Sequence, residues 1–327
     1  MIFLGVNMRL FFSKYLETKI RALRKVFALY VGLFQNIRHS QSLNNVIFYQ
    51  MIAHLNCKEA VISLARSYKF GVNVVQDNDN LQRYLECFRP HKHNALKLQR
   101  YGGLGDGGYN MLPPPCNKNE VQPIALSLGV SYYAPWDLEL ADMGYKVLEF
   151  DASVPQSPYP NHKNIIFFKK FVGINETHDT IGLDQIIKEH DFNRKAHNIM
   201  QCDIEDAEWD ILEKIDMNLI TDNFSQILFE FHNCYPDDTR GISQRLRVLE
   251  KINESYVPIW THYNNSGGLL IGVINNEVIP FCPSVEVTYL RRDLLPPDSV
   301  MVIGLANVLP EPNNFAKPDI PVFFPKM

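Results

Sequence analysis

The chain has 327 residues, of which 46% are hydrophobic, and carries a formal net charge of −4 with a pI near 6.2. This length and apolar content suffice for a full-size core, so we expect one large globular domain with appendages. The charge balance gives no general electrostatic reason for nucleic-acid binding. Six cysteines without any C-x-x-C pair argue against a zinc site or a disulfide framework and favour buried thiols in a reducing compartment.

The first 39 residues are far more basic than the rest, with seven Lys or Arg against the single Glu17. Apolar residues recur there at steps of three or four, which predicts a basic amphipathic helix over residues 1–40. The longest apolar run, 26–34, has nine residues and is too short to span a bilayer, and the layout is not that of a signal peptide. We expect a cytoplasmic protein whose helix packs on its own domain, binds a partner, or contacts the inner face of a membrane peripherally through residues 9–37.

Residues 41–94 are predicted to be a helical connecting region, with helices over 56–68 and 78–88 and a strand-like run at 71–76. From 95 to 293, short apolar runs alternate with helical stretches, which is typical of an α/β domain with a mostly parallel sheet. The proline-rich segment 294–327 is expected to wrap the domain in extended form. The expected strands lie near 124–128, 146–150, 164–168, 197–202, 226–231, 256–262, 269–274 and 284–290, and the close spacing of the last three predicts a final antiparallel hairpin.

A glycine-rich run at 103–108 matches the dinucleotide fingerprint G-x-G-x-x-G in its letters. That fingerprint requires a helix to begin at the run, so that backbone amides can bind a pyrophosphate. The three prolines at 113–115 prevent such a helix, so we expect a tight turn with Asp106 and Gly107 at its tip. The glycine-rich run is therefore no evidence for an NAD-binding site.

Two strands around the helical stretch 136–143 form a βαβ pattern. The first strand stops at Gly129, where the missing side chain lets a ligand approach the backbone. The second stops at Asp151, 22 residues later, where a carboxylate can accept hydrogen bonds from a ribose. The unit predicts a nucleoside-cofactor site at the carboxyl edge of the sheet.

Later strands also end in polar residues. Asp203 and Glu205 follow one strand, and Glu230 and His232 are two residues apart at the end of the next, hence on the same side of it. His262 is followed by Asn264 in the same spacing. Because open α/β sheets bind ligands at the carboxyl ends of their strands, we expect these groups to converge on one crevice.

In this order the motifs resemble those of the FkbM-type methyltransferases and related methyltransferase-like proteins. Two positions depart from that family pattern: Asp206 replaces a glycine, and Tyr133 stands where relatives often have an acid. The resemblance runs from about residue 97 to the C-terminus, and its segments read D-G-G-Y at 106–109, S-L-G-V-S at 127–131, W-D-L-E-L-A at 136–141, E-F-D-A-S at 149–153, D-I-E-D-A-E-W at 203–209, F-E-F-H at 229–232, H-Y-N-N at 262–265, P-N-N at 312–314 and K-P-D-I at 317–320.

The resemblance implies a Rossmann-like, seven-strand fold that binds S-adenosylmethionine. Carried over by position, Gly129 approaches the cofactor and Asp151 binds its ribose hydroxyls. The remaining implied cofactor residues are Asp106 and Asp203, which line the methionine end, with Gly108, Ser131 and Ala152. The alternative for Asp203 is a cap on the helix that begins near Asp206.

Methyl transfer to a hydroxyl requires an aligned acceptor and a base. His232 is the first candidate for the base because an imidazole can be neutral at pH 7. The other expected catalytic residues are Glu205 and Glu230, which orient His232 or act in its place, and His262. Alternatively, a divalent metal ion that acidifies the hydroxyl is held by Asp203, Glu230, His232 and His262, or the two histidines are only hydrogen-bonded within the fold.

The expected function is O-methylation of a sugar hydroxyl on a saccharide or glycolipid-linked glycan, with the acceptor class taken from the family resemblance alone. Two other classes stay open. A binding or scaffold protein would keep the fold without turnover, which the departures at Asp206 and Tyr133 allow. An NAD-dependent oxidoreductase is the third.

Overall fold

The computed structural model describes residues 43–114, 121–307 and 311–326. Contacts divide the chain into two units, Met1–Ile47 and Phe48–Met327, and the second contains the central sheet and the candidate site. The predicted amphipathic helix at 1–40 lies outside the described residues. In the described part of the chain, no helix has the length and apolar character that crossing a membrane requires.

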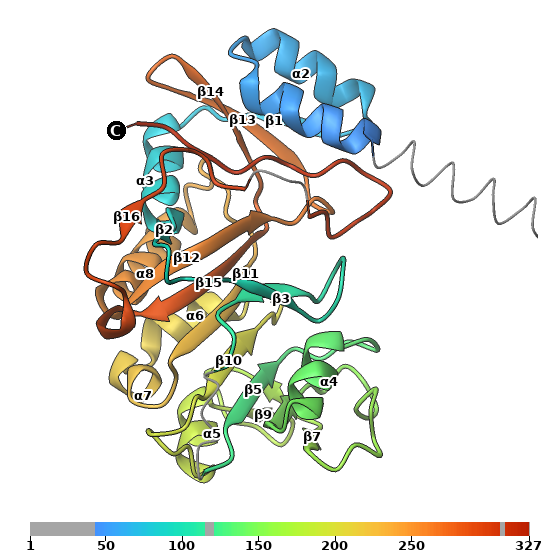
Figure 1. Ribbon diagram of the computed structural model, residues 1–327, viewed down its shortest axis with the longest axis vertical. Coiled ribbons are helices and arrows are strands. Elements are labelled where there is room, and N and C mark those ends of the chain that lie inside the picture. The colour runs from blue at the N-terminus through green and yellow to red at the C-terminus, as the bar shows by residue number, and fades with distance from the viewer. Residues whose placement is uncertain (1–42, 115–120, 308–310, 327) are drawn as a thin grey trace, which may run out of the picture. The chain divides into compact units, whose positions relative to one another are not determined.

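A seven-stranded sheet forms the centre of this unit (Figure 1). Six strands run parallel and only β15 is antiparallel to its neighbours. The spatial order is β12 (Tyr256–Tyr263), β15 (Val285–Arg291), β11 (Gln226–Phe231), β10 (Ile199–Cys202), β5 (Ile124–Leu128), β6 (Lys146–Phe150) and β7 (Ile165–Phe168). Four of them, β5, β10, β11 and β12, are buried along their whole length, which agrees with their predominantly apolar sequences.

Helices connect most of the parallel strands, as the alternating pattern predicts, whereas β6 and β7 are joined by a non-helical loop. Pro135 occupies the first turn of α4 (Pro135–Asp142), where its missing N–H is not needed. In α8 (Ile242–Ser255), which has 14 residues, the buried Leu246, Leu249 and Ile252 recur at helical spacing. The others are α2 (Lys58–Ser67), α3 (Asn78–Phe88), α5 (Leu183–Glu189), α6 (Glu208–Lys214) and α7 (Met217–Thr221), with a 3₁₀ turn, η1, at Arg292–Leu294.

One prediction about the end of the sheet is wrong. The strand expected at 269–274 is present as β13 (Leu269–Ile274), but it does not join the central sheet. It pairs with β14 (Glu277–Phe281) through a hairpin whose turn residues, Asn275 and Asn276, both have positive φ, and with β1 (Val72–Val74). The antiparallel strand of the central sheet is β15, which inserts between β11 and β12.

The glycine-rich run forms a loop and not the start of a helix, in agreement with the prediction. It joins the antiparallel pair β3 (Gln99–Tyr101) and β4 (Tyr109–Met111). The guanidinium of Arg100 donates hydrogen bonds to the carbonyls of Gly103 and Gly105, which holds the loop in place.

The C-terminal segment lies against other parts of the unit and forms short strand pairs. The buried Arg89 donates to the carbonyls of Val302 and Pro325, which fixes two points of this segment. The remaining small pairings are β16 (Val300–Met301) with β2 (His91–Lys92), β17 (Gly304–Leu305) with β18 (Phe323–Phe324), and β8 (Phe171–Val172) with β9 (Thr180–Ile181). Of the five cysteines described, four are buried and all are free thiols, as predicted.

His197 beside β10 should make stability depend on pH. Burial lowers its pKa from 6.5 to about 4, and Nδ1 lies 2.7 Å from the Tyr145 hydroxyl. Because the unfolded chain takes up the proton first, its contribution is complete above pH 6.5 and is lost as the pH falls towards 4, by about 3 kcal/mol in total. Urea unfolding at pH 7 and pH 5 should show a smaller loss in His197→Gln than in the wild type, and parallel losses would contradict the assignment.

Candidate functional site

A cavity of about 150 Å³ lies at the carboxyl ends of β5 and β10. Its lining includes four of the residues predicted for the cofactor, namely Asp106, Gly129, Ser131 and Asp203. These come from three separate loops, after β3, β5 and β10, so the parallel sheet brings them together. A larger cavity of about 490 Å³ lies beside β2 and β12, but its lining contains only one acid, Asp298.

At Gly129 the neighbouring backbone leaves no room for a side chain. Its φ is +84°, and a Cβ built on it would lie 1.7 Å from the carbonyl oxygen of Asp203. Its N–H donates to the carbonyl of Phe150, and the N–H of Asp203 donates to the carbonyl of Leu128. The ends of β5, β6 and β10 are thus drawn together at a position that only glycine can occupy.

Asp151 connects the β6 loop to the β5 loop. Its Oδ2 accepts the N–H of Val130 at 2.9 Å, and its Oδ1 accepts the N–H of Ser153 at 2.6 Å. A carboxylate offers about four lone-pair positions, so these two bonds leave acceptor capacity for a hydroxyl pair. Asp151 and two other predicted cofactor residues, Gly108 and Ala152, are not part of the cavity lining.

Buried polar side chains line one part of the cavity, and the sequence analysis did not assign them. Asp137 on α4 is 2% exposed and accepts the hydroxyl of Ser127, while Glu149 on β6 is fully buried. Burial, and then the nearby charge of Glu149, raises the pKa of Asp137 well above its usual range. Gln201 joins these side chains by donating to the hydroxyl of Tyr109. The only sequence signal was an acid placed inside each of two apolar segments.

Four carboxylates surround His232 at the end of β11, and we call these five residues the His232 group. Nε2 lies 3.8 Å from Oδ1 of Asp203, 3.6 Å from Oε2 of Glu205 and 3.7 Å from Oε1 of Glu230. On the other side of the ring, Nδ1 lies 3.3 Å from Oε1 of Glu208, which also accepts the backbone N–H of His232. Glu208 is fully buried and was not predicted.

The charges of the group shift its pKa values. Burial alone would lower the pKa of His232, but the hydrogen bond with Glu208 and the charges of Glu230, Glu208 and Asp203 raise it to about 9. Burial raises the pKa of Asp203 to about 7, against the opposing effect of His232. An imidazole with these neighbours holds a proton at pH 7 unless another cation replaces it.

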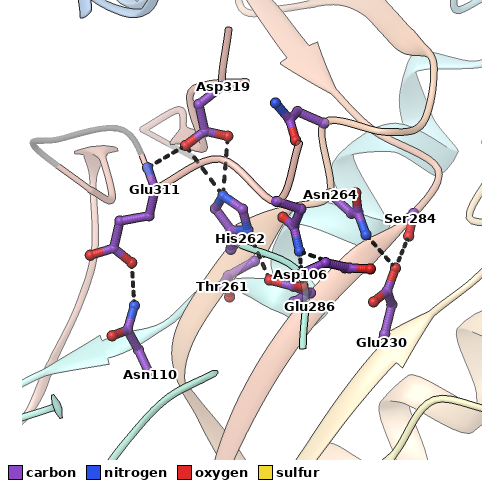
Figure 2. Close-up of polar contacts among 12 residues, drawn as sticks. Asp106, Asn110, Glu230, Thr261, His262, Asn264, Ser284, Glu286, Glu311 and Asp319 are labelled. Atoms are coloured by element: carbon purple, nitrogen blue, oxygen red, sulfur yellow. Dashed lines mark hydrogen bonds and ion pairs between the residues drawn. The ribbon is translucent and has the colours of Figure 1, made fainter. Parts of the chain in front are cut away.

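Glu230 links the His232 group to a second polar cluster. Its Oε1 accepts hydrogen bonds from Nδ2 of Asn264 at 2.8 Å and from the hydroxyl of Ser284 at 2.7 Å (Figure 2). Carboxylate oxygens of Asp106, Glu230 and Glu286 lie within 4.8 Å of one another. Nδ2 of one amide, Asn313 from the C-terminal segment, contacts both Glu286 and Asp106.

His262 occupies a different place from His232. It is 2% exposed, with Nδ1 2.9 Å from Glu286 and Nε2 3.1 Å from Asp319 (Figure 2). Burial would lower its pKa, but Asp319 and Glu286 raise it to about 10, so His262 is an imidazolium inside the fold. Among the described residues, the hydrogen-bond and ion-pair partners of His262 are Glu286 and Asp319, neither of which belongs to the His232 group. Glu286 in turn lies near Glu230 of that group.

Asp206 stands in a turn whose backbone conformation favours glycine. Asp206 has a φ of +84° and Glu205 a φ of +55°, both in the left-handed region. Glycine adopts this region without a steric penalty, so a glycine would suit this turn. The turn nevertheless directs Glu205 towards His232. Tyr133, the other departure, lines the cavity and is 65% exposed.

Comparison with known proteins adds no assignment to this geometry: a scan of protein-family models and a search of curated proteins both return no match for the chain.

Proposed function

We propose that the protein is an S-adenosylmethionine-dependent methyltransferase that methylates a hydroxyl, with a sugar as the acceptor class. The observation that carries this proposal is the edge where Gly129, Asp151 and Asp203 end three adjacent parallel strands. A Rossmann-like methyltransferase fold belongs to the proposal. It is supported by a seven-stranded sheet with a single antiparallel strand next to its end.

The cavity suits the methionine end of the cofactor. Asp106 and Asp203 line it, and a carboxylate is the natural partner of an α-ammonium group. The missing side chain of Gly129 allows close approach to the backbone, and Asp151 lies one strand further along with lone pairs for ribose hydroxyls. The cofactor would therefore extend from the cavity across the end of β6.

The acceptor step belongs next to the cavity, at the His232 group, because Asp203 is part of both. In the displacement, the acceptor oxygen forms a bond to the methyl carbon, the carbon–sulfur bond breaks, and its electron pair stays on sulfur. The hydroxyl proton must leave to a base. Nε2 of His232 faces three carboxylates, so without another cation the imidazole keeps its proton, and the hydroxyl proton passes to a carboxylate of the group such as Glu230.

Calorimetry with S-adenosylmethionine, S-adenosylhomocysteine and NAD tests the proposal. We expect both adenosyl compounds to bind and NAD not to bind. Turnover on a panel of glycans should then transfer the methyl group. Binding without turnover on any hydroxyl would favour the scaffold alternative, and NAD binding alone would favour an oxidoreductase.

Asp151→Asn should weaken S-adenosylhomocysteine binding by at least tenfold, because it removes the charge that accepts the ribose hydroxyls. Asp142→Asn is a suitable control, since Asp142 is an exposed acid at the end of α4 whose ion pair, within the described residues, is with His162. The measurement is the calorimetric dissociation constant. Equal affinity in both variants would remove Asp151 from the ribose site.

A further inference from the structure

We propose that the His232 group binds one divalent transition-metal ion, with Asp203, Glu205 and His232 as its ligands. Donor atoms of these three residues lie within 4.8 Å of one another. Binding of the ion is independent of methyl transfer, whereas its use on an acceptor hydroxyl rests on the proposed function.

The spacing of the donor atoms suits a shared ion better than direct hydrogen bonds. Nε2 of His232 is 3.6 to 3.8 Å from oxygens of Glu205 and Asp203, which is too long for a hydrogen bond. Two ligands held about 2.1 Å from one ion, at an angle of about 110–120°, lie about 3.5 Å apart. A small inward movement of these side chains would close such a coordination sphere.

The orientation of the imidazole is set from its far side. The fully buried Glu208 accepts from both Nδ1 and the backbone N–H of His232, so the ring directs Nε2 towards the other carboxylates. Histidines that bind metals usually donate their second N–H to a carboxylate in this way. With Nδ1 protonated, a lone pair on Nε2 would face carboxylate oxygens, which is favourable only with a cation between them.

An unsatisfied oxygen points to the same place. Oδ1 of Asp203 is buried and has no hydrogen-bond partner among the described residues, and it is the atom that faces Nε2. Within the part of the chain that the structure describes, the ion pairs of Asp203, Glu205 and Glu230 are all with His232. Several carboxyl groups therefore share one imidazole, and a buried carboxylate oxygen without a donor is unfavourable unless a cation binds it.

The neighbouring acidic cluster of Asp106, Glu230 and Glu286 differs in this respect. Its oxygens already accept from Asn264, Ser284 and Asn313, and Glu286 also pairs with His262. It is a hydrogen-bonded network. We place the ion at the His232 group for this reason, with Glu230 beside it.

The ligand set indicates the kind of ion. One imidazole and two carboxylates suit Mn²⁺ or Zn²⁺ better than Ca²⁺, which takes six to eight oxygens. Three protein ligands leave positions open for water or a substrate hydroxyl. Because Asp203 also lines the cavity, a hydroxyl on the ion would lie beside the methyl donor, become more acidic, and lose its proton to Glu230 before it attacks the methyl carbon.

The test measures Mn²⁺ alone on the full-length, chelator-treated protein, by calorimetry and electron paramagnetic resonance. We expect one site in the wild type and at least tenfold weaker binding in Glu205→Gln, whose side chain is 86% exposed and whose fold should be intact. Asp206→Asn is the matched control, since it removes the same charge one residue away and should bind as the wild type does. A wild type without a Mn²⁺ site, or equal affinity in the two variants, overturns the proposal.

A second readout identifies the nitrogen ligand. Spin-echo modulation from a coordinated imidazole should be present in the wild type and absent in His232→Gln, and modulation in both would overturn the assignment of His232. Methyl transfer is then assayed with and without chelator. Mn²⁺ binding without any binding of S-adenosylhomocysteine would contradict the proposed function alone, whereas cofactor binding and transfer without a Mn²⁺ site would contradict the ion alone.

Discussion

Gly129→Ala should destabilise the fold by about 3 kcal/mol or more and abolish binding of S-adenosylhomocysteine. The new Cβ would lie 1.7 Å from a backbone oxygen, which cannot move away as a flexible side chain could. The strand ends of β5 and β10 would have to separate, in addition to the strain of an alanine at a φ of +84°. Chemical unfolding gives the stability, and calorimetry gives the binding.

Gly144→Ala provides the matched control for Gly129→Ala. Gly144 also has a positive φ, +99°, but a Cβ there would meet nothing within 4 Å. Gly144→Ala should therefore lose only about 1–2 kcal/mol of stability, which is what an alanine at positive φ costs, and cofactor binding should be unchanged. If the two variants were equally stable, the close approach of Gly129 to Asp203 would not be a feature of the folded protein.

His262→Leu should destabilise the protein by about 3–5 kcal/mol, because it leaves two buried carboxylates without their cation. Those carboxylates belong to Glu286 and Asp319, which are each 1% exposed. Asp319 also accepts the N–H groups of Glu311 and Ile320, so we expect the C-terminal segment to become protease-sensitive. Unfolding free energies and limited proteolysis measure the two effects.

The effect of His262 should depend on pH in a stated direction. Its pKa in the fold, about 10, is above the unfolded value of 6.5, so its contribution is complete below pH 6.5 and is lost as the pH rises towards 10. The difference between wild type and His262→Leu should shrink over that interval. His178→Leu is the control, since His178 is 97% exposed beside Asp179 and should change stability little. If His262→Leu lost as little stability as His178→Leu, the ion pairs of His262 with Glu286 and Asp319 would not stabilise the fold.

Much of the secondary structure could be predicted because its causes are local. The bounds predicted for 124–128, 146–150 and 226–231 agree with β5, β6 and β11, since each is an apolar run ended by a glycine or a polar residue. The helix at 78–88 agrees with α3, whose cap, Asp77, accepts the N–H of Asn80. The three prolines excluded a helix after the glycine-rich run, and the described residues there form the strand β4 and then non-helical chain up to residue 114.

The site could be predicted only in part. Strand ends bearing Asp203, Glu205, Glu230 and His232 do converge, because parallel strands present their carboxyl ends at one edge. Glu208, which orients His232, was missed because an acid in the first turn of a helix is usually explained by its favourable interaction with the helix dipole. The buried Asp137 and Glu149 were missed because burial of a charge leaves no mark on local periodicity.

The sequence by itself determined the α/β class, most strand positions and the set of polar strand ends, because apolar spacing and turn residues act over a few neighbouring positions. Only the tertiary structure decided that β13 leaves the central sheet, and that His262 pairs with Asp319, 57 residues away. The reason is physical: which strands pair and which charges lose their water depends on contacts between segments far apart in the chain, and those contacts form only when the whole unit folds.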